Sequence, residues 1–159
     1  MSFIGIVAYE NIENCIDKKL EKELNVNREK IFDIKEKNIE NIKNISFETI
    51  IIAREFNNKE ILKRIIEKAN YLIVNSDIKE NLDMLLNMKA TIITYGFNSK
   101  ATITASSVQD EEMIICVQRT MQTIKGKIIE PQEFIVPIYE NVECTMSIIT
   151  TLLLYGKII

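Results

Sequence analysis

Residues 71–108 constrain the fold of this chain more than any other segment. They contain two apolar runs, 71–74 and 91–94, and each run stops at a polar or glycine turn. The runs begin about twenty residues apart with a helical segment between them, which is the repeat of a parallel α/β sheet. Ligands of such sheets bind where the carboxyl ends of the strands meet. The candidate site therefore comprises the turn residues Asn75, Ser76, Asp77, Tyr95, Gly96, Phe97 and Asn98.

Apolar runs and helical spacing predict the other elements of the fold. Further strands are expected at residues 3–9 and 47–53, with a weaker one at 31–34. Apolar residues three and four positions apart predict helices at residues 15–24, 59–69 and 139–155. The expected helix caps are Asn58 for the helix at 59–69, Asn11 or Asn14 for the first helix, and Gly156 as the stop of the last.

The two remaining segments differ in character. Residues 35–46 are rich in lysine, glutamate and asparagine, which predicts a solvated surface segment. Residues 111–137 carry short apolar runs and a turn at Gly126, which predict an antiparallel meander. The expected fold is a three-layer α/β domain over residues 1–159, with a mostly parallel sheet extended by this meander.

Composition excludes several kinds of partner. The apolar content of 47% and the charged content of 27% are typical of a globular protein. A net charge of −3 argues against general affinity for nucleic acid or for an anionic membrane surface. The sequence contains no apolar stretch of membrane-spanning length and no basic region before its first apolar run. We therefore expect a cytoplasmic location, with no nucleic-acid partner and no membrane partner.

The reactive residue types are sparse. The chain has no histidine, which removes the commonest general base and the commonest metal ligand. Cys15, Cys116 and Cys144 lie far apart in the sequence, so their spacing indicates neither a disulfide framework nor a metal site. Without a histidine to activate them, they are interpreted as inert thiols. The junction after the first strand, Ala8-Tyr9-Glu10-Asn11, also lacks the glycines and lysine of a phosphate loop.

Three motifs, taken in order, resemble a known family. The chain has Val74-Asn75-Ser76-Asp77, then Thr94-Tyr95-Gly96, then an alternating segment at residues 101–105. Over roughly residues 60–156 this succession is similar to the central domain of the Mur ligases, the ATP-dependent enzymes that add amino acids to the peptidoglycan precursor of bacteria. The resemblance implies a Mur-ligase-like fold in which the turn after residue 74 lies near the adenine and ribose of a nucleotide.

The chain departs from that family at the residues that carry the chemistry. The phosphate loop, the metal-binding histidine and the two flanking domains of the ligases have no counterpart in this sequence. Without them, acyl-phosphate chemistry lacks electrostatic support. We therefore expect a pseudoenzyme without a cofactor or a metal, with a binding or regulatory role that the resemblance links to cell-wall precursor metabolism.

Alternative interpretations remain open at this stage. The chain could be a histidine-free enzyme that uses carboxylates such as Asp77 and Glu55. It could also be a structural protein that forms a homo-oligomer through its apolar last helix. For the candidate site itself, the alternative is that Asn75 and Asp77 only cap the following helix and that Gly96 only supplies a turn with positive φ.

Overall fold

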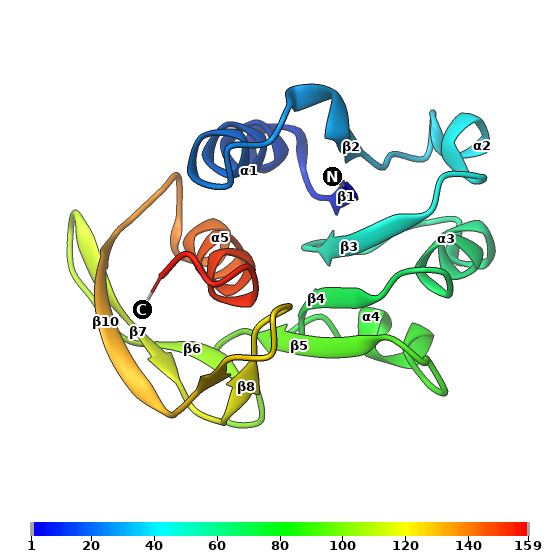
Figure 1. The fold of residues 1–159 in the computed structure, drawn as a ribbon. Coiled ribbons are helices and arrows are strands. Elements are labelled where there is room, and N and C mark those ends of the chain that lie inside the picture. Colours follow the sequence, from blue (N-terminus) through cyan, green and yellow to red (C-terminus); the bar gives the residue numbers. More distant parts are fainter. Residues whose placement is uncertain (1, 159) are drawn as a thin grey trace.

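The computed structural model describes residues 2–158, which form an eight-stranded sheet with helices on both faces (Figure 1). The sheet consists of β1 (Phe3–Val7), β2 (Ile31–Asp33), β3 (Phe47–Ile52), β4 (Tyr71–Asn75), β5 (Thr91–Tyr95), β6 (Ile103–Val108), β7 (Glu112–Val117) and β10 (Gln132–Pro137). A separate two-stranded sheet pairs β8 (Met121–Gln122) with β9 (Ile128–Ile129). The helices are α1 (Glu10–Glu23), α2 (Ile39–Ile42), α3 (Lys59–Ile66), α4 (Lys79–Met84) and α5 (Val142–Leu154), with a 3₁₀ turn at Arg28–Lys30.

The strand order confirms the predicted mixed sheet. It runs β10-β7-β6-β5-β4-β3-β1-β2, and the neighbours from β2 to β6 pair in parallel. β7 is antiparallel to both β6 and β10, which is the predicted meander extension. The chain passes from β1 outward to β2 and then returns to the other side of β1 with β3. This change of direction places a topological switch point between β1 and β3.

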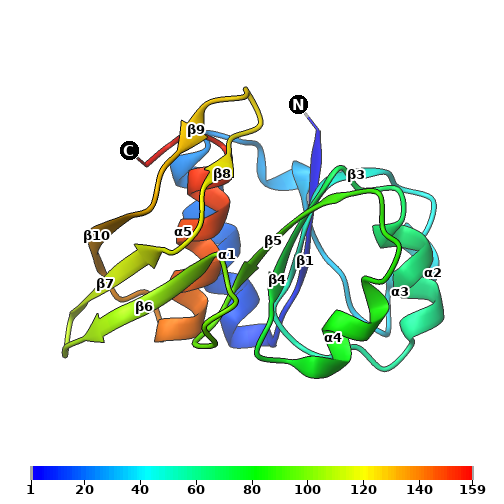
Figure 2. The ribbon, with the colours of Figure 1, turned by 90° about the horizontal axis from the view of Figure 1, so that it is seen from below.

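The helices complete a three-layer arrangement (Figures 1 and 2). α1 and α5 cover one face of the sheet, and α2, α3 and α4 cover the other. Each face buries its own apolar cluster, one including Ile16, Ile73 and Leu153 and the other including Ile50, Leu62 and Leu72. The meander strands β6, β7 and β10 curve around α5, so this helix is enclosed by the sheet and by α1.

Helix α5 is buried around its whole circumference from Cys144 to Leu154. Three of its buried hydroxyl groups donate hydrogen bonds to backbone carbonyls of the same helix. The hydroxyl groups of Thr150 and Thr151 donate to backbone carbonyls one turn earlier at 2.6 and 2.8 Å, and that of Ser147 donates to the carbonyl of Cys144 at 2.7 Å. These bonds remove the cost of burying a hydroxyl group. The apolar surface of α5 is thus covered by the chain itself.

Two local expectations were wrong. Neither Asn11 nor Asn14 caps the first helix, because α1 begins at Glu10 and the carbonyl of Tyr9 accepts from the N–H groups of Ile12 and Glu13. Residues 35–46 are not wholly solvated, because α2 buries Ile39 and Ile42 against α3 and β3. By contrast, Asn58 caps α3 as predicted, with its side chain accepting from the N–H of Ile61.

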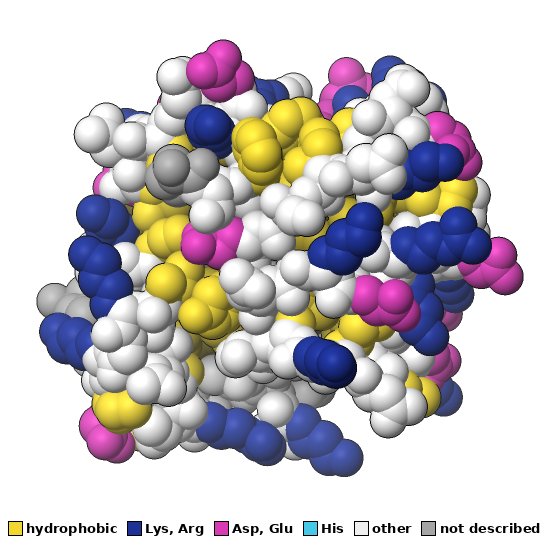
Figure 3. All heavy atoms as spheres, turned by 45° about the vertical axis from the view of Figure 1, so that its right-hand side comes forward, with side chains coloured by type: hydrophobic (Ala, Val, Ile, Leu, Met, Phe, Trp, Pro, Cys, Tyr) yellow, Lys and Arg dark blue, Asp and Glu magenta, His cyan; other side chains and the backbone are white. Residues whose placement is uncertain are grey.

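The surface bears both signs of charge. On the face shown in Figure 3, Lys and Arg side chains are intermingled with Asp and Glu side chains, and apolar side chains form small patches between them. None of the helices within residues 2–158 has the length and apolar character needed to cross a bilayer.

The hydroxyl of Tyr155 provides a test of how α5 is anchored to the sheet. It lies 2.8 Å from the hydroxyl of the fully buried Thr49 and 2.9 Å from a carboxylate oxygen of Glu48 on β3. We expect Tyr155→Phe to lower the free energy of unfolding by about 1–3 kcal/mol, since Thr49 loses its partner. Denaturant titration measures this. The control is Tyr139→Phe, because the hydroxyl of Tyr139 has no hydrogen bond among residues 2–158; equal losses would contradict the anchoring role.

Candidate functional site

A cavity of about 330 Å³ opens at the carboxyl ends of the parallel strands β1, β3, β4 and β5. This is the edge of the sheet at which α1 and α5 both begin (Figure 2). It also contains the switch point between β1 and β3, where open α/β sheets bind ligands. The lining residues are Tyr9, Asn11, Ile12, Ala53, Asn75, Asp77, Ile78, Tyr95, Asn141, Glu143 and Cys144.

Asn75 is a largely buried polar residue of the cavity lining. It ends β4 and is only 5% exposed. Its Oδ1 accepts from the backbone N–H of Asp77 at 3.0 Å, which fixes the orientation of the amide. Its Nδ2 has no hydrogen-bond partner among residues 2–158, although Asn75 lines the cavity. This nitrogen is not among the buried side-chain atoms that lack a partner, so solvent reaches it and it is free to donate to a ligand.

Asp77 has a different role from the one predicted for it. It does not cap α4, whose N-cap residue is Ile78. Instead, its carboxylate accepts from the N–H groups of Phe97 and Asn98 at 2.7 and 3.1 Å and from the Asn98 side chain at 2.7 Å. The expectation that Asn75 and Asp77 are helix caps was therefore wrong. Asp77 joins the turn after β4 to the loop after β5.

Gly96 makes this junction sterically feasible. Its φ is 153°. A positive φ at Gly96 is what the alternative interpretation of the site expected. A Cβ at this position would lie 2.7 Å from the Asp77 carboxyl carbon. The loop is further held by Asn98, whose side chain donates to Ser76 Oγ at 2.8 Å. Ser76 in turn bonds to the carbonyl of Tyr95 through its N–H and its hydroxyl.

The seven predicted residues thus divide into two groups. Asn75, Asp77 and Tyr95 line the cavity, and burial raises the pKa of Tyr95 so that its phenol stays neutral. Ser76, Gly96 and Asn98 form the supporting loop, and the Phe97 side chain is 52% exposed outside it. The structure brings the two predicted turns together, as expected, but only part of them faces the cavity.

The cavity also uses residues that the sequence did not single out as a site. Tyr9 lies at the start of α1, Ala53 follows β3, and Asn141 and Glu143 begin α5. Asn141 caps α5, with its Oδ1 accepting from the N–H of Cys144 at 2.8 Å. Asn141 fell inside the predicted helix at 139–155 and was not identified as a cap from the sequence. Its position beside β4 and β5 could not be predicted either, because this depends on where α5 packs.

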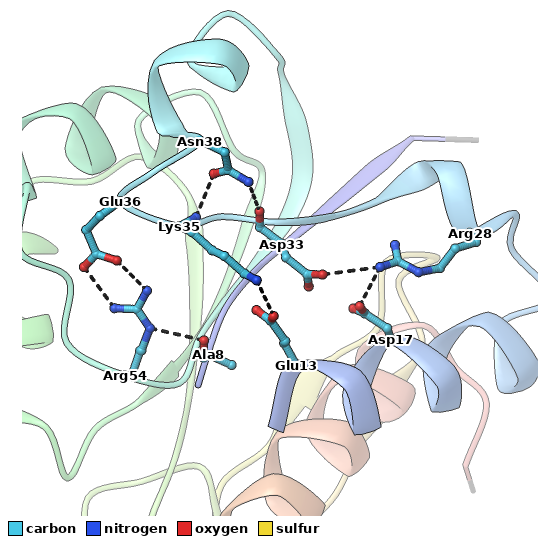
Figure 4. A network of polar contacts seen from close by, with 9 residues as sticks. All are labelled: Ala8, Glu13, Asp17, Arg28, Asp33, Lys35, Glu36, Asn38 and Arg54. Atoms are coloured by element: carbon cyan, nitrogen blue, oxygen red, sulfur yellow. Dashed lines mark hydrogen bonds and ion pairs between the residues drawn. The ribbon is translucent and has the colours of Figure 1, made fainter. Parts of the chain in front are cut away.

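No lysine or arginine is among the described residues that line the cavity. Arg54 directly follows the lining residue Ala53, and its guanidinium carbon lies 5.9 Å from the centre of the Tyr9 ring. Its guanidinium is engaged by Glu36 through two contacts of 2.8 and 3.1 Å, and its Nε donates to the carbonyl of Ala8 at 3.2 Å (Figure 4). Arg54 holds the pKa of Glu36 down at about 2. The charge of the arginine is thus paired with Glu36 beside the end of β1, where a phosphate loop would lie.

A second polar cluster joins α1 to the segment that begins at β2 (Figure 4). Lys35 contacts Glu13 at 2.7 Å, and Arg28 contacts Asp17 at 2.7 Å and Asp33 at 3.3 Å. Three carboxylates therefore face two cations. One oxygen of each carboxylate has no partner among residues 2–158. This is the arrangement in which a buried carboxyl retains a proton.

Asp17 is the carboxyl of this cluster whose pKa is raised. Burial and the adjacent Asp33 raise the pKa of Asp17 from its usual value of 3.8 to about 7, and these effects outweigh the lowering by Arg28. The cluster lies outside the residues that line the cavity. Its role is structural, since it attaches the first turns of α1 to the sheet.

The two carboxylates considered for catalysis, Asp77 and Glu55, do not line the same cavity. Glu55 is exposed and does not line the cavity that contains Asp77. Among residues 2–158, no group of three or more histidine, cysteine, aspartate or glutamate side chains has an arrangement that could hold a metal ion.

Comparison with known proteins adds no assignment. No protein family model matches the chain, and no curated protein matches it in sequence.

Replacing the carboxylate that joins the two turns tests its structural role. We expect Asp77→Asn to lower the free energy of unfolding by about 1–2 kcal/mol, because an amide presents one acceptor oxygen and an NH₂ group to N–H donors. The control is Asp83→Asn, an exposed carboxylate on α4 that has no hydrogen bond among residues 2–158. Denaturant titration distinguishes the two variants. Equal stability of both would show that the junction contributes nothing.

The raised pKa of Asp17 predicts a pH dependence of stability. Between about pH 4 and pH 7 the native state holds a proton that the unfolded chain has released, so the free energy of unfolding falls as the pH rises. Glu36 acts in the opposite direction but only below about pH 4.5, where its usual pKa lies. Denaturant titrations from pH 4 to pH 8 measure this slope. We expect Asp17→Asn to flatten it, and an unchanged slope would contradict the assignment.

Proposed function

We propose that this chain is a non-catalytic binding protein with a Mur-ligase-like fold, and that its ligand occupies the cavity at the carboxyl ends of β1, β3, β4 and β5. The observation that carries the proposal is Asn75, a largely buried residue that lines this cavity and whose Nδ2 makes no hydrogen bond among residues 2–158. A cavity of about 330 Å³ is in the range of small-molecule sites.

The charges around the cavity define the class of ligand. Its ionisable lining residues include the carboxylates Asp77 and Glu143, and the amides of Asn11, Asn75 and Asn141 add neutral polar groups. A phosphate would be repelled here, since Arg54 is neutralised by Glu36 and Glu10 begins α1. A neutral or cationic ligand with hydrogen-bonding groups fits instead. Tyr9, which is 64% exposed at the rim, offers a ring against which a flat or sugar-like ligand can pack.

The same residues argue against catalysis. Both oxygens of Asp77 already accept hydrogen bonds from the neighbouring loop, so this carboxylate is not free to act as a base. Glu55 lies outside the cavity, and the chain has no histidine. General acid–base chemistry needs a titratable group within hydrogen-bond reach of the ligand and with an unoccupied site for the proton.

The connection to cell-wall precursor metabolism follows from the sequence resemblance to the Mur ligases. The architecture supports it in one respect: the turn after β4 and the loop after β5, which carry the resembling motifs, adjoin the cavity. In the proposed site they bind a neutral or cationic part of a ligand rather than its phosphates.

Calorimetric titration with matched pairs of probes tests the proposal. The pairs are adenosine with ATP and N-acetylglucosamine with UDP-N-acetylglucosamine, and ethanolamine serves as a small cation. We expect saturable binding of at least one neutral or cationic probe and weaker binding of its phosphate-bearing partner. Asn75→Ala should weaken this binding about five- to tenfold through loss of one hydrogen bond.

The matched control is Asn44→Ala, an exposed asparagine remote from the cavity, which should bind as the unaltered protein does. Melting curves of both variants verify that they are folded. The proposal fails if none of the probes binds saturably, if only phosphate-bearing probes bind, or if Asn75→Ala binds as tightly as the control.

A further inference from the structure

Two of the three cysteines lie on the same side of the sheet, on the two helices α1 and α5. Cys15 is on α1 and Cys144 is on α5, and these helices pack directly together. Cys144 belongs to the apolar cluster on this face of the sheet, and Cys15 packs against the same cluster. Burial, followed by the neighbouring Cys15 thiol, raises the pKa of Cys144. The two cysteines thus lie on directly packed helices and beside one apolar cluster, and Cys15 borders a surface groove together with Glu140, four residues before Cys144.

The two thiols differ in their access to solvent. Cys144 is 1% exposed and lines the inner cavity. Cys15 is partly exposed and borders an open surface groove of about 430 Å³, together with Asn14, Lys18, Lys19, Lys22 and Glu140. A small oxidant from solvent therefore reaches Cys15 first. This is the arrangement of an accessible thiol with a second thiol beside it that can resolve the oxidised form.

Cys116 lies apart from this pair. It is on β7, where Met113, Ile115 and Val117 point into the cluster that surrounds α5. Because side chains alternate along a strand, Cys116 faces the opposite side of the sheet. It therefore serves as an internal reference for nonspecific oxidation.

We propose that Cys15 and Cys144 form a peroxide-sensitive redox pair that closes to an intramolecular disulfide between α1 and α5. The sulfur of Cys15 attacks hydrogen peroxide, so that an S–O bond forms, the O–O bond breaks and water leaves. The sulfur of Cys144 then attacks the resulting sulfenic acid, forming the S–S bond and breaking the S–O bond. The proton of Cys144 leaves with the hydroxyl as a second water.

The disulfide would have two structural consequences. It links two helices that are far apart in the sequence, which restricts the unfolded chain and raises the melting temperature. It also fixes the wall of the cavity at Cys144, so oxidation would alter ligand affinity. This second consequence rests on the proposed function, whereas disulfide formation does not.

Peptide mapping by mass spectrometry tests the pair. The reduced full chain is treated with hydrogen peroxide, alkylated with iodoacetamide and digested. We expect a peptide linked through Cys15 and Cys144, with Cys116 still alkylated, and reduction with dithiothreitol should restore all three free thiols. The oxidised protein should melt at a higher temperature than the reduced protein.

Three variants provide the controls. Cys15→Ser and Cys144→Ser should each abolish the linked peptide, and Cys116→Ser should retain it. Cys15→Ser changes a partly exposed residue, so the test remains valid even if the buried Cys144→Ser fails to fold. The proposal is overturned if Cys15 is oxidised to a sulfinic acid without a link, if Cys116 enters the linked peptides, or if peroxide leaves all three thiols free. This readout needs no ligand, so it stands or falls separately from the binding experiment.

Discussion

The burial of α5 is the constraint on which the rest of this structure depends. A helix with no solvent-facing side must be enclosed, and the chain encloses it by curving β6, β7 and β10 around it and packing α1 alongside. Burial of its apolar residues is favourable, and its serine and threonine hydroxyls are satisfied within the helix. The antiparallel meander is therefore not an accessory to the parallel sheet, because it supplies the wall that α5 requires.

The position of α5 also determines the candidate site. Its N-terminus reaches the same edge of the sheet as the start of α1, and the two helix starts and four strand ends enclose the cavity. In an α/β protein that binds phosphates, this edge would carry free N–H groups and a cation. Here the first turn of α1 carries Glu10 and Glu13, and Arg54 is held by Glu36. The strand ends and helix starts thus enclose a cavity as in a phosphate-binding protein, while the charges around it disfavour a phosphate.

Much of the architecture was predictable from local patterns. The apolar runs at residues 71–74 and 91–94 correspond to β4 and β5, the meander was expected, and Asn58 caps α3. The candidate site was predictable only in outline. Asn75, Asp77 and Tyr95 were correctly placed at adjoining strand ends, but Asp77 was interpreted as a cap, and its actual partners, Phe97 and Asn98, lie twenty or more residues away. Helix-cap patterns are local, whereas this bond depends on the pairing of β4 with β5.

The sequence by itself determined the types of the elements, the absence of histidine and the lack of a phosphate loop, because these depend on residue identity and short-range periodicity. Only the tertiary structure decided which side chains meet. It placed Asn75 in the lining of the cavity, enclosed α5, and brought the helices that carry Cys15 and Cys144 together. The physical reason is that such contacts arise from strand order and helix packing, which join residues far apart in the chain and leave no local pattern in the sequence.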